Sequence, residues 1–219
     1  MKHFSFEITG STPLIMHADN IPWADQMTEW KKKSKDAKSS PAGDDRHPAY
    51  RWIGCLCNNG VHVGIPSNYM TTCLMKAASR VSTGSRNKTF KTESVAMMGF
   101  NDELFPLATR AGEVRWEDVV PMVNEPEFSK HQSFASKHGF ELHICRASVG
   151  ASKHIRVRPK FNSWKFNGTL WVDNDSLASS LPEIFEMAGN VVGLGDWRPS
   201  APKKPGPYGR FSATIKEIK

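Results

Sequence analysis

The chain has 219 residues, of which 39% are hydrophobic, so it can bury one good core that carries elaborations. Its formal charge at pH 7 is +7, and residues 151–219 hold 11 Lys and Arg against 6 Asp and Glu. This uneven charge favours a polyanionic partner, although ordinary soluble proteins can be equally basic. No run approaches the roughly 18 apolar residues of a membrane span, so we expect no membrane partner.

The cysteine pattern argues against a metal centre. The four cysteines are Cys55, Cys57, Cys73 and Cys145. Only the first two form a close pair, whereas a zinc site usually needs a second pair at ligand spacing. We therefore expect free, buried thiols in a reducing cytoplasm, and no metal.

The first strand is predicted from Phe4, Phe6 and Ile8, which alternate with polar residues in a pattern unlike the apolar core of a signal peptide. From residue 19 to residue 60 the composition changes, with a lysine-rich run at 30–35 and a Ser, Pro and Gly-containing stretch at 39–45. We interpret 19–60 as a helical insertion whose lysines form either a solvated face or a contact surface.

A helix is predicted from Ser67, as N-cap, through apolar residues at helical spacing up to Val81. A polar, basic loop follows over 82–91, and residues 93–100 read as a buried strand. Several prolines between 101 and 140 predict an irregular or hairpin excursion.

Two further strands are predicted at 141–148 and 154–159, each with alternating apolar residues. Arg156 and Arg158 would project from one face of the second strand. Their charges repel, so we expect either an anion beside them or carboxylates such as Asp173 or Asp175.

Asn167-Gly168 between apolar segments predicts a hairpin turn. Ser180 and Glu183 predict a capping box that opens a helix extending to Ala188, and alternation at 211–216 predicts the last strand. Without its insertions the order is β-α-β-β-α-β. The sequence thus predicts an α+β chain with a ferredoxin-like (RRM-like) core in one domain, residues 1–219.

The stretch from Gly189 to Phe211 would join the last helix to the last strand. A loop of about fifteen residues is long for such a connection and is more often functional or disordered than merely connecting. Its glycines permit close approach by another backbone or by a phosphate group. Its cations and aromatic rings suit a nucleic-acid strand.

This arrangement resembles the RAMP superfamily, the RNA-binding proteins of CRISPR effector complexes and their processing nucleases. The similarity lies in the glycine-rich stretch 193–211, in Ile65-Pro66-Ser67 before the first helix, and in Thr12-Pro13-Leu14 after the first strand. Gly-Leu-Gly-Asp-Trp-Arg-Pro at 193–199, in combination with Met16-His17 and Arg156-Val157-Arg158-Pro159, also looks like a group of phage-encoded proteins. The resemblance implies a cytoplasmic protein of a bacterial cell or a phage-infected host, and a thumb-like hairpin that we assign to 101–140.

Nucleic-acid binding requires phosphate contacts and stacking faces. The candidate phosphate contacts are Lys76, Arg80, Arg86, Lys88, Lys91, Arg156, Arg158, Lys160, Arg198, Lys203, Lys204 and Arg210. The candidate stacking rings are Trp164, Trp197 and Tyr208, although core packing is the common fate of a tryptophan.

Catalysis is a separate hypothesis. The resemblance implies that His17, just after the first strand, is a candidate acid or base of a metal-independent endoribonuclease. It likewise makes Asp19 and Asp25 candidates for target cleavage. No dinucleotide fingerprint, phosphate loop or His-Glu-x-x-His motif occurs, so we expect no cofactor.

Three functions remain open. The first is a subunit that binds single-stranded RNA, or single-stranded DNA, and assembles along it with copies of itself or with other CRISPR-like subunits. The second is the endoribonuclease. The third is a phage protein that mimics a CRISPR subunit and inhibits or regulates the complex.

Overall fold

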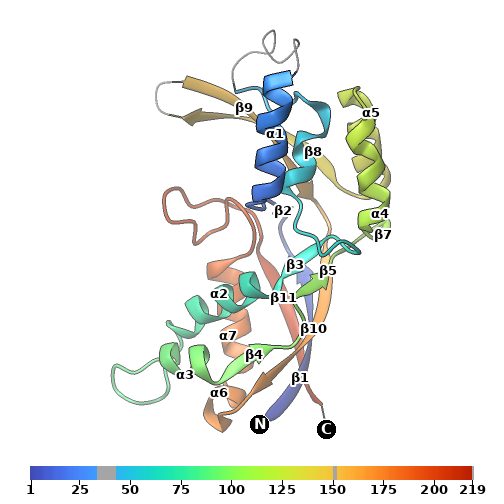
Figure 1. The fold of residues 1–219 in the computed structure, drawn as a ribbon. Helices are drawn as coiled ribbons and strands as arrows, with labels where there is room; N and C mark the ends of the chain where they lie inside the picture. The colour runs from blue at the N-terminus through green and yellow to red at the C-terminus, as the bar shows by residue number, and fades with distance from the viewer. Residues whose placement is uncertain (34–42, 150–151, 219) are drawn as a thin grey trace.

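The computed structural model describes residues 1–33, 43–149 and 152–218. Helices cover one face of an antiparallel sheet, and a smaller antiparallel sheet lies above it with helices on either side (Figure 1). The predicted α+β class is confirmed. Both chain termini lie at the lower end of the large sheet, because the first and last strands pair with one another.

The large sheet has the order β11-β1-β10, and β4 and β6 pair with the other side of β10. Its strands are β1 (Lys2–Gly10), β4 (Met98–Phe100), β6 (Ala108–Thr109), β7 (Gly112–Glu113), β10 (Lys165–Val172) and β11 (Phe211–Ile218). Phe4, Phe6 and Ile8 of β1 are buried, as their alternation predicts. The ring centroid of Phe6 lies 5.7 Å from that of Phe185 in the helical layer and 5.8 Å from that of Phe100.

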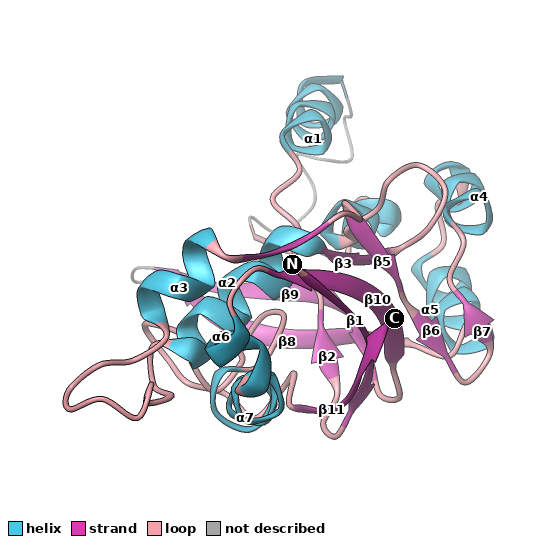
Figure 2. Ribbon diagram, turned by 90° about the horizontal axis from the view of Figure 1, so that it is seen from below, coloured by secondary structure: helices cyan, strands magenta, loops and turns pink. Residues whose placement is uncertain are grey.

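The helical layer on this sheet is visible in Figure 2. It consists of α2 (Ser67–Ala78), α3 (Lys91–Ala96), α6 (Asp175–Ser179) and α7 (Leu181–Met187), which continues into a π-helical turn, η4 (Ala188–Val192). Met70 and Leu74 of α2 and Ile184 of α7 are fully buried between the layer and the sheet. The apolar spacing on α2 is therefore explained by core packing.

The smaller sheet has the order β2-β9-β8, made of β2 (Leu14–Ile15), β8 (Glu141–Val149) and β9 (Ser152–Phe161). The predicted strands at 141–148 and 154–159 are thus confirmed and form one long hairpin. Beside it lie α1 (Ile21–Lys33), a 3₁₀ helix η2 (Ala49–Cys55) and α5 (Phe128–Lys137) (Figure 1). Trp52 of η2 donates a hydrogen bond to buried His131 of α5, at 2.9 Å.

The predicted turn at Asn167-Gly168 is wrong, because β10 runs straight through both residues. They pair with Glu7 and Phe6 in an unbroken antiparallel ladder. A Cβ atom at Gly168 would lie 2.4 Å from the ring of Phe105. This glycine therefore makes room for a neighbouring ring within a strand.

Three local predictions are wrong in detail. The buried strand predicted at 93–100 is divided between α3 and β4. Ser67 is the first residue of α2, whose N-cap is Pro66. Ser180 does precede α7, but its side chain makes no capping hydrogen bond there, so the predicted capping box does not form.

The range 101–140 holds short strands and helices. Besides β6, β7 and α5 it contains β5 (Leu104–Pro106), which pairs with β3 (Gly64–Pro66), then α4 (Trp116–Val119) and a 3₁₀ helix η3 (Val120–Asn124). Strands β6 and β7 form a short antiparallel hairpin within this range, and the long hairpin β8–β9 comes directly after it. The assignment of 101–140 as an irregular or thumb-like excursion stays a prediction. The lysine-rich helix is α1, and residues 34–42 of the predicted insertion lie outside the described residues. The division at 19–60 remains a prediction.

Within the described part of the chain, no helix combines the length and the apolar character that crossing a membrane requires.

Candidate nucleic-acid interface

The glycine-rich loop, residues 193–210, is held against the segment that follows β1. The amide of Asp196 donates to the carbonyl of Ile15 at 2.8 Å, and the amide of Gly209 donates to the carbonyl of Pro13, also at 2.8 Å. Backbone hydrogen bonds at both ends give the loop a defined path beside β2. The loop is therefore long but structurally anchored.

Two glycines of this loop are required by close backbone packing. Gly195 and Gly209 have φ angles of 75° and 74°. Cβ atoms at these positions would lie 2.5 Å from the oxygen of Ile15 and 1.8 Å from the oxygen of Leu194. Of the two partners that the sequence allows, a backbone and a phosphate, it is the backbone that approaches these glycines.

A cleft of about 330 Å³ lies between α2 and the glycine-rich loop. Its polar lining residues are His17, Asn68, Tyr69, Thr72, Lys76, Asp196 and Arg198. Its remaining surface includes apolar side chains of β2, β3 and η4. Two cations, an aromatic ring and hydrogen-bonding groups around one hollow are the set of contacts that a nucleotide uses.

The guanidinium of Arg198 is fixed at this cleft, because its Nη1 donates to the carbonyl of Gly195 at 2.8 Å. Lys76 lies in the last turn of α2 and is exposed. Burial raises the pKa of the Tyr69 hydroxyl to about 12, so this group is a protonated hydrogen-bond donor at neutral pH. The cleft is thus positively charged at one wall and keeps a neutral phenol at another.

His17 is half exposed and lies 3.7 Å from Asp196, measured from Nδ1 to Oδ2. Burial lowers its pKa, and the nearby Arg158 lowers it further, against the opposing effect of Asp196. The ring is therefore neutral at pH 7. His17 lines this cleft and also a second, open cavity of about 340 Å³, which is lined by residues of α1, η2 and β9.

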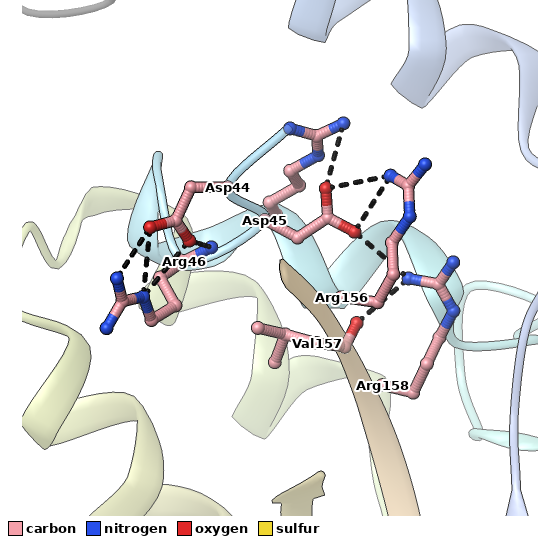
Figure 3. A network of polar contacts seen from close by, with 7 residues as sticks. Asp44, Asp45, Arg46, Arg156, Val157 and Arg158 are labelled. Atoms are coloured by element: carbon pink, nitrogen blue, oxygen red, sulfur yellow. Dashed lines mark hydrogen bonds and ion pairs between the residues drawn. The ribbon is translucent and has the colours of Figure 1, made fainter. Parts of the chain in front are cut away.

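The second cavity is bordered by a charge cluster centred on Asp45, which is 4% exposed (Figure 3). Arg156 Nη1 lies 3.1 and 3.2 Å from its two carboxylate oxygens, and Arg158 Nη1 lies 3.4 Å from Oδ2. Arg51 Nη2 lies 3.2 Å from Oδ1. The carboxylate beside the two strand arginines is therefore Asp45. The predicted partners Asp173 and Asp175 pair instead with the N-terminal amino group and with a lysine.

The aromatic pair of the loop is Trp197 and Tyr208, whose ring centroids are 5.9 Å apart. Lys204 Nζ lies 5.8 Å from the Trp197 ring centroid, and Lys203 is exposed next to it. Both residues are partly exposed. The backbone amide of Arg210 donates to Thr12 Oγ1 at 2.9 Å.

The prediction that Trp164 is a stacking ring for a base is wrong, because this side chain is buried. Its side chain is 2% exposed, and its Nε1 donates to the carbonyl of Thr12 at 2.8 Å. Its ring is stacked on Phe166 within the core, at a centroid distance of 6.2 Å.

The remaining predicted phosphate contacts separate into two groups. The first group is exposed and lies on α2 and in the segment that follows it: Lys76, Arg80, Arg86, Lys88 and Lys91. Of this group only Lys76 lines the cleft. Lys160, by contrast, is 17% exposed and bonds Glu141 at 2.6 Å, so its charge is already paired.

The two predicted catalytic carboxylates, Asp19 and Asp25, lie in different surroundings. Asp19 lines the second cavity together with His17. Asp25 is exposed on α1 and lines neither cavity, so the structure does not place it beside His17.

The prediction of free, buried thiols is confirmed for Cys55, Cys57 and Cys73, and burial raises the pKa of Cys57 to about 11.

Sequence reasoning missed four contributors: Asp45, Arg51, Tyr69 and Asp196. Tyr69 does fall on the apolar face of the predicted helix, where its spacing indicates core packing. Asp45 is 111 residues from Arg156, so no local pattern could have linked the two.

No protein family and no curated protein matches this sequence. Among solved structures, it has weak similarity to "Cryo-EM structure of the Type III-B Cmr-beta bound to cognate target RNA and AMPPnP, state 1", with 11% identity and a TM-score of 0.34, over 97% of this chain and 62% of that one. A second is "Cryo-EM structure of the Type III-B Cmr-beta bound to cognate target RNA", with 12% identity and a TM-score of 0.34, over 97% of this chain and 63% of that one. This chain thus spans less than two thirds of the chains it matches.

Proposed function

We propose that this protein binds single-stranded nucleic acid, RNA in preference to DNA, in the cleft between α2 and the glycine-rich loop. The observation that carries this proposal is the convergence of Lys76 and Arg198 on one cleft that also presents Tyr69 and His17. Cations supply phosphate contacts that are independent of sequence, and the ring and hydroxyl groups supply base or sugar contacts.

The order of the elements supports a ferredoxin-like core for this function. β1, α2, β4, β10, α7 and β11 follow one another along the chain, and their sheet order is β11-β1-β10-β4. Both α2 and α7 cover one face, as expected for a β-α-β-β-α-β unit. We infer a RAMP-like subunit with an insertion at 19–60, which assembles with copies of itself or with other CRISPR-like subunits along the strand.

The direct test is the binding of a fluorescently labelled oligouridylate, followed by anisotropy between about 50 and about 200 mM salt. We expect affinity that falls steeply with salt, and an RNA strand that binds more tightly than DNA of matched sequence. The Lys76→Gln variant should bind roughly fivefold more weakly, a loss of about 1 kcal/mol. Lys137→Gln, at an exposed lysine of α5 that lines neither cavity, is the charge-matched control and should bind like the unmodified protein.

A second candidate function is favoured by one observation: His17 is half exposed, neutral, and lies between the two cavities. A neutral imidazole beside a bound strand can accept the proton of a 2′-hydroxyl in metal-independent RNA cleavage. We expect chelator-resistant cleavage that is lost in His17→Ala if this function holds. RNA that stays intact during a long incubation would reject it and leave the binding function standing.

The third hypothesis, a protein that inhibits or regulates a CRISPR complex, predicts a different result. A protein without affinity for RNA or DNA at low salt would contradict the first two functions together. Binding to a purified effector complex, measured without added nucleic acid, would then support the third.

A further inference from the structure

The Asp45 cluster holds more positive charge than its carboxylate can balance. Arg51, Arg156 and Arg158 all point their guanidinium groups at this one side chain. The neighbouring Asp44 is not available to them, because its carboxylate bonds Arg46 at 2.6 Å. In residues 1–33, 43–149 and 152–218, Asp45 is the only carboxylate that forms an ion pair with any of the three arginines.

The arginines are neither fully buried nor free in solvent. The exposed fractions of their side chains are 26%, 27% and 15% for Arg51, Arg156 and Arg158. Like charges held together at this depth repel one another, and the repulsion is relieved by a second anion. Asp45 occupies one side of the guanidinium groups and holds them together, as Figure 3 shows for the two strand arginines.

The cluster faces a cavity that has room for an anion. All three arginines and Asp45 line the second cavity, of about 340 Å³. The other titratable groups that face it are Lys31 of α1, Asp19, His17 and the thiol of Cys55, whose pKa is raised by burial. Cations outnumber carboxylates around this cavity, so its net charge is positive with His17 neutral.

His17 connects this cavity to the cleft beside α2, because it lines both. A strand that leaves the cleft past His17 would therefore next meet the cavity that the arginine cluster lines. Planar guanidinium groups bind phosphate oxygens through paired N–H donors, and several that converge provide a stronger site than a single lysine.

We propose that Arg51, Arg156 and Arg158 form a phosphate-binding site, and that a strand bound in the cleft beside α2 places a neighbouring phosphate group there. This inference rests on the proposed function for the identity of the strand. Asp45 is the internal counter-ion that positions the arginines. The strand then runs from α2 past His17 toward α1, and the segment that contains Asp45 and Arg51 contributes directly to binding.

The test measures the binding of labelled oligouridylate as a function of salt for Arg51→Gln, Arg156→Gln and Arg158→Gln. Glutamine removes the charge and keeps a polar side chain of similar shape up to the position of the arginine Nε. Each substitution should weaken binding several-fold at low salt and reduce the slope of log K against log[salt] by roughly 0.7, the value for one phosphate contact with a single strand. Arg115→Gln, whose arginine pairs with exposed Glu117 outside both cavities, should leave the slope unchanged.

A second arm uses inorganic phosphate and starts from the unmodified protein, whose result does not depend on the folding of any variant. Phosphate should raise the melting temperature above its value in chloride of equal ionic strength. The increase should be smaller in Arg51→Gln, which leaves the ion pairs of Arg156 and Arg158 with Asp45 in place.

The outcomes separate this inference from the proposed function. RNA binding with an unchanged slope in all three variants would overturn the inference and leave the proposed function intact. If the protein does not bind RNA, but phosphate stabilises it and the variants lose this stabilisation, then the ligand of the arginines is not a nucleic-acid strand. That result would overturn the proposed function. No RNA binding and no stabilisation by phosphate would overturn both.

Discussion

Asp45 and Arg156 lie 111 residues apart in the chain, and their side chains meet at 3.1 Å. Backbone hydrogen bonds reinforce the contact, because the amide of Asp45 donates to the carbonyl of Ile155 at 3.0 Å and the amide of Ile155 donates to Gly43 at 2.9 Å. The contact attaches the segment before η2 to strand β9. The same residues thus hold two distant parts of the chain together and carry the charge of the proposed phosphate site.

Asp45→Asn should destabilise the protein by about 2–4 kcal/mol, because it leaves three partly buried guanidinium groups without a counter-ion. The measurement is urea unfolding followed by tryptophan fluorescence. Asp173→Asn is the control: its carboxylate is 65% exposed and pairs only with the N-terminal amino group, so its loss should be below about 1 kcal/mol. Equal effects of the two substitutions would contradict a structural role for Asp45.

The free energy of unfolding should decrease as the pH is lowered, and protonation of His131 should account for part of this decrease. Burial lowers the pKa of this histidine, whose Nδ1 accepts from Trp52 at 2.9 Å and whose Nε2 donates to the carbonyl of Glu125. Because the pKa in the folded protein is below the ordinary value of 6.5, protonation favours the unfolded chain. This contribution is complete above pH 6.5 and is lost as the pH falls from 6.5 toward the folded-state pKa.

The measurement is the free energy of unfolding as a function of pH, in the unmodified protein and in His131→Gln. The variant should be less stable at neutral pH but should lose less stability on acidification. His17 and His143 also have lowered pKa values and contribute to the total slope, so the difference between the two curves is the quantity to compare. Parallel curves would mean that His131 does not titrate with unfolding.

Gly209→Ala should cost more stability than Gly84→Ala, although both glycines have positive φ angles, of 74° and 81°. The conformational strain of a left-handed alanine, about 1–2 kcal/mol, is common to both. Only at Gly209 would the added Cβ meet a backbone oxygen, that of Leu194 at 1.8 Å, since nothing lies within 4 Å at Gly84. Denaturant unfolding of the two variants checks this prediction, which fails if their midpoints coincide.

Trp164→Ala should mainly lower the stability of the fold, whereas Trp197→Ala should mainly lower the affinity for RNA. Loss of the buried Trp164 should destabilise the fold by about 3–5 kcal/mol, because it leaves a cavity beside Phe166. Loss of the half-buried Trp197 should change stability little and weaken RNA binding by about 1–3 kcal/mol if a base stacks on its face. Melting temperatures and anisotropy of the same two preparations distinguish these effects. RNA affinity that is unchanged in Trp197→Ala would remove this ring from the interface.

Several elements could be predicted from the sequence because their signals are local. The alternation of Phe4, Phe6 and Ile8 identifies β1, the pattern at 141–159 identifies β8 and β9, and the apolar spacing after Ser67 identifies α2. In each case residues a few positions apart share one buried face, so neighbouring positions are enough to reveal the element.

The candidate site could be predicted only in part. The glycine-rich loop was recognisable from its length and composition, and Arg198 and Lys76 from their charge. Which of the basic residues line a cleft depends on how α2 and the loop pack against β2, and that packing is set by contacts between distant segments. The same dependence explains why Trp164 is buried whereas Trp197 stays partly exposed.

By itself, the sequence determined the basic character of the chain, its α+β class and the positions of its main amphipathic elements, because these follow from composition and short-range periodicity. Only the tertiary structure decided that Asn167-Gly168 lies within a strand, that Asp45 balances the two strand arginines, and that His17 joins two cavities. The physical reason is that a turn signal yields to sheet pairing and packing around Phe105, and that an ion pair or a cavity exists only where distant segments meet.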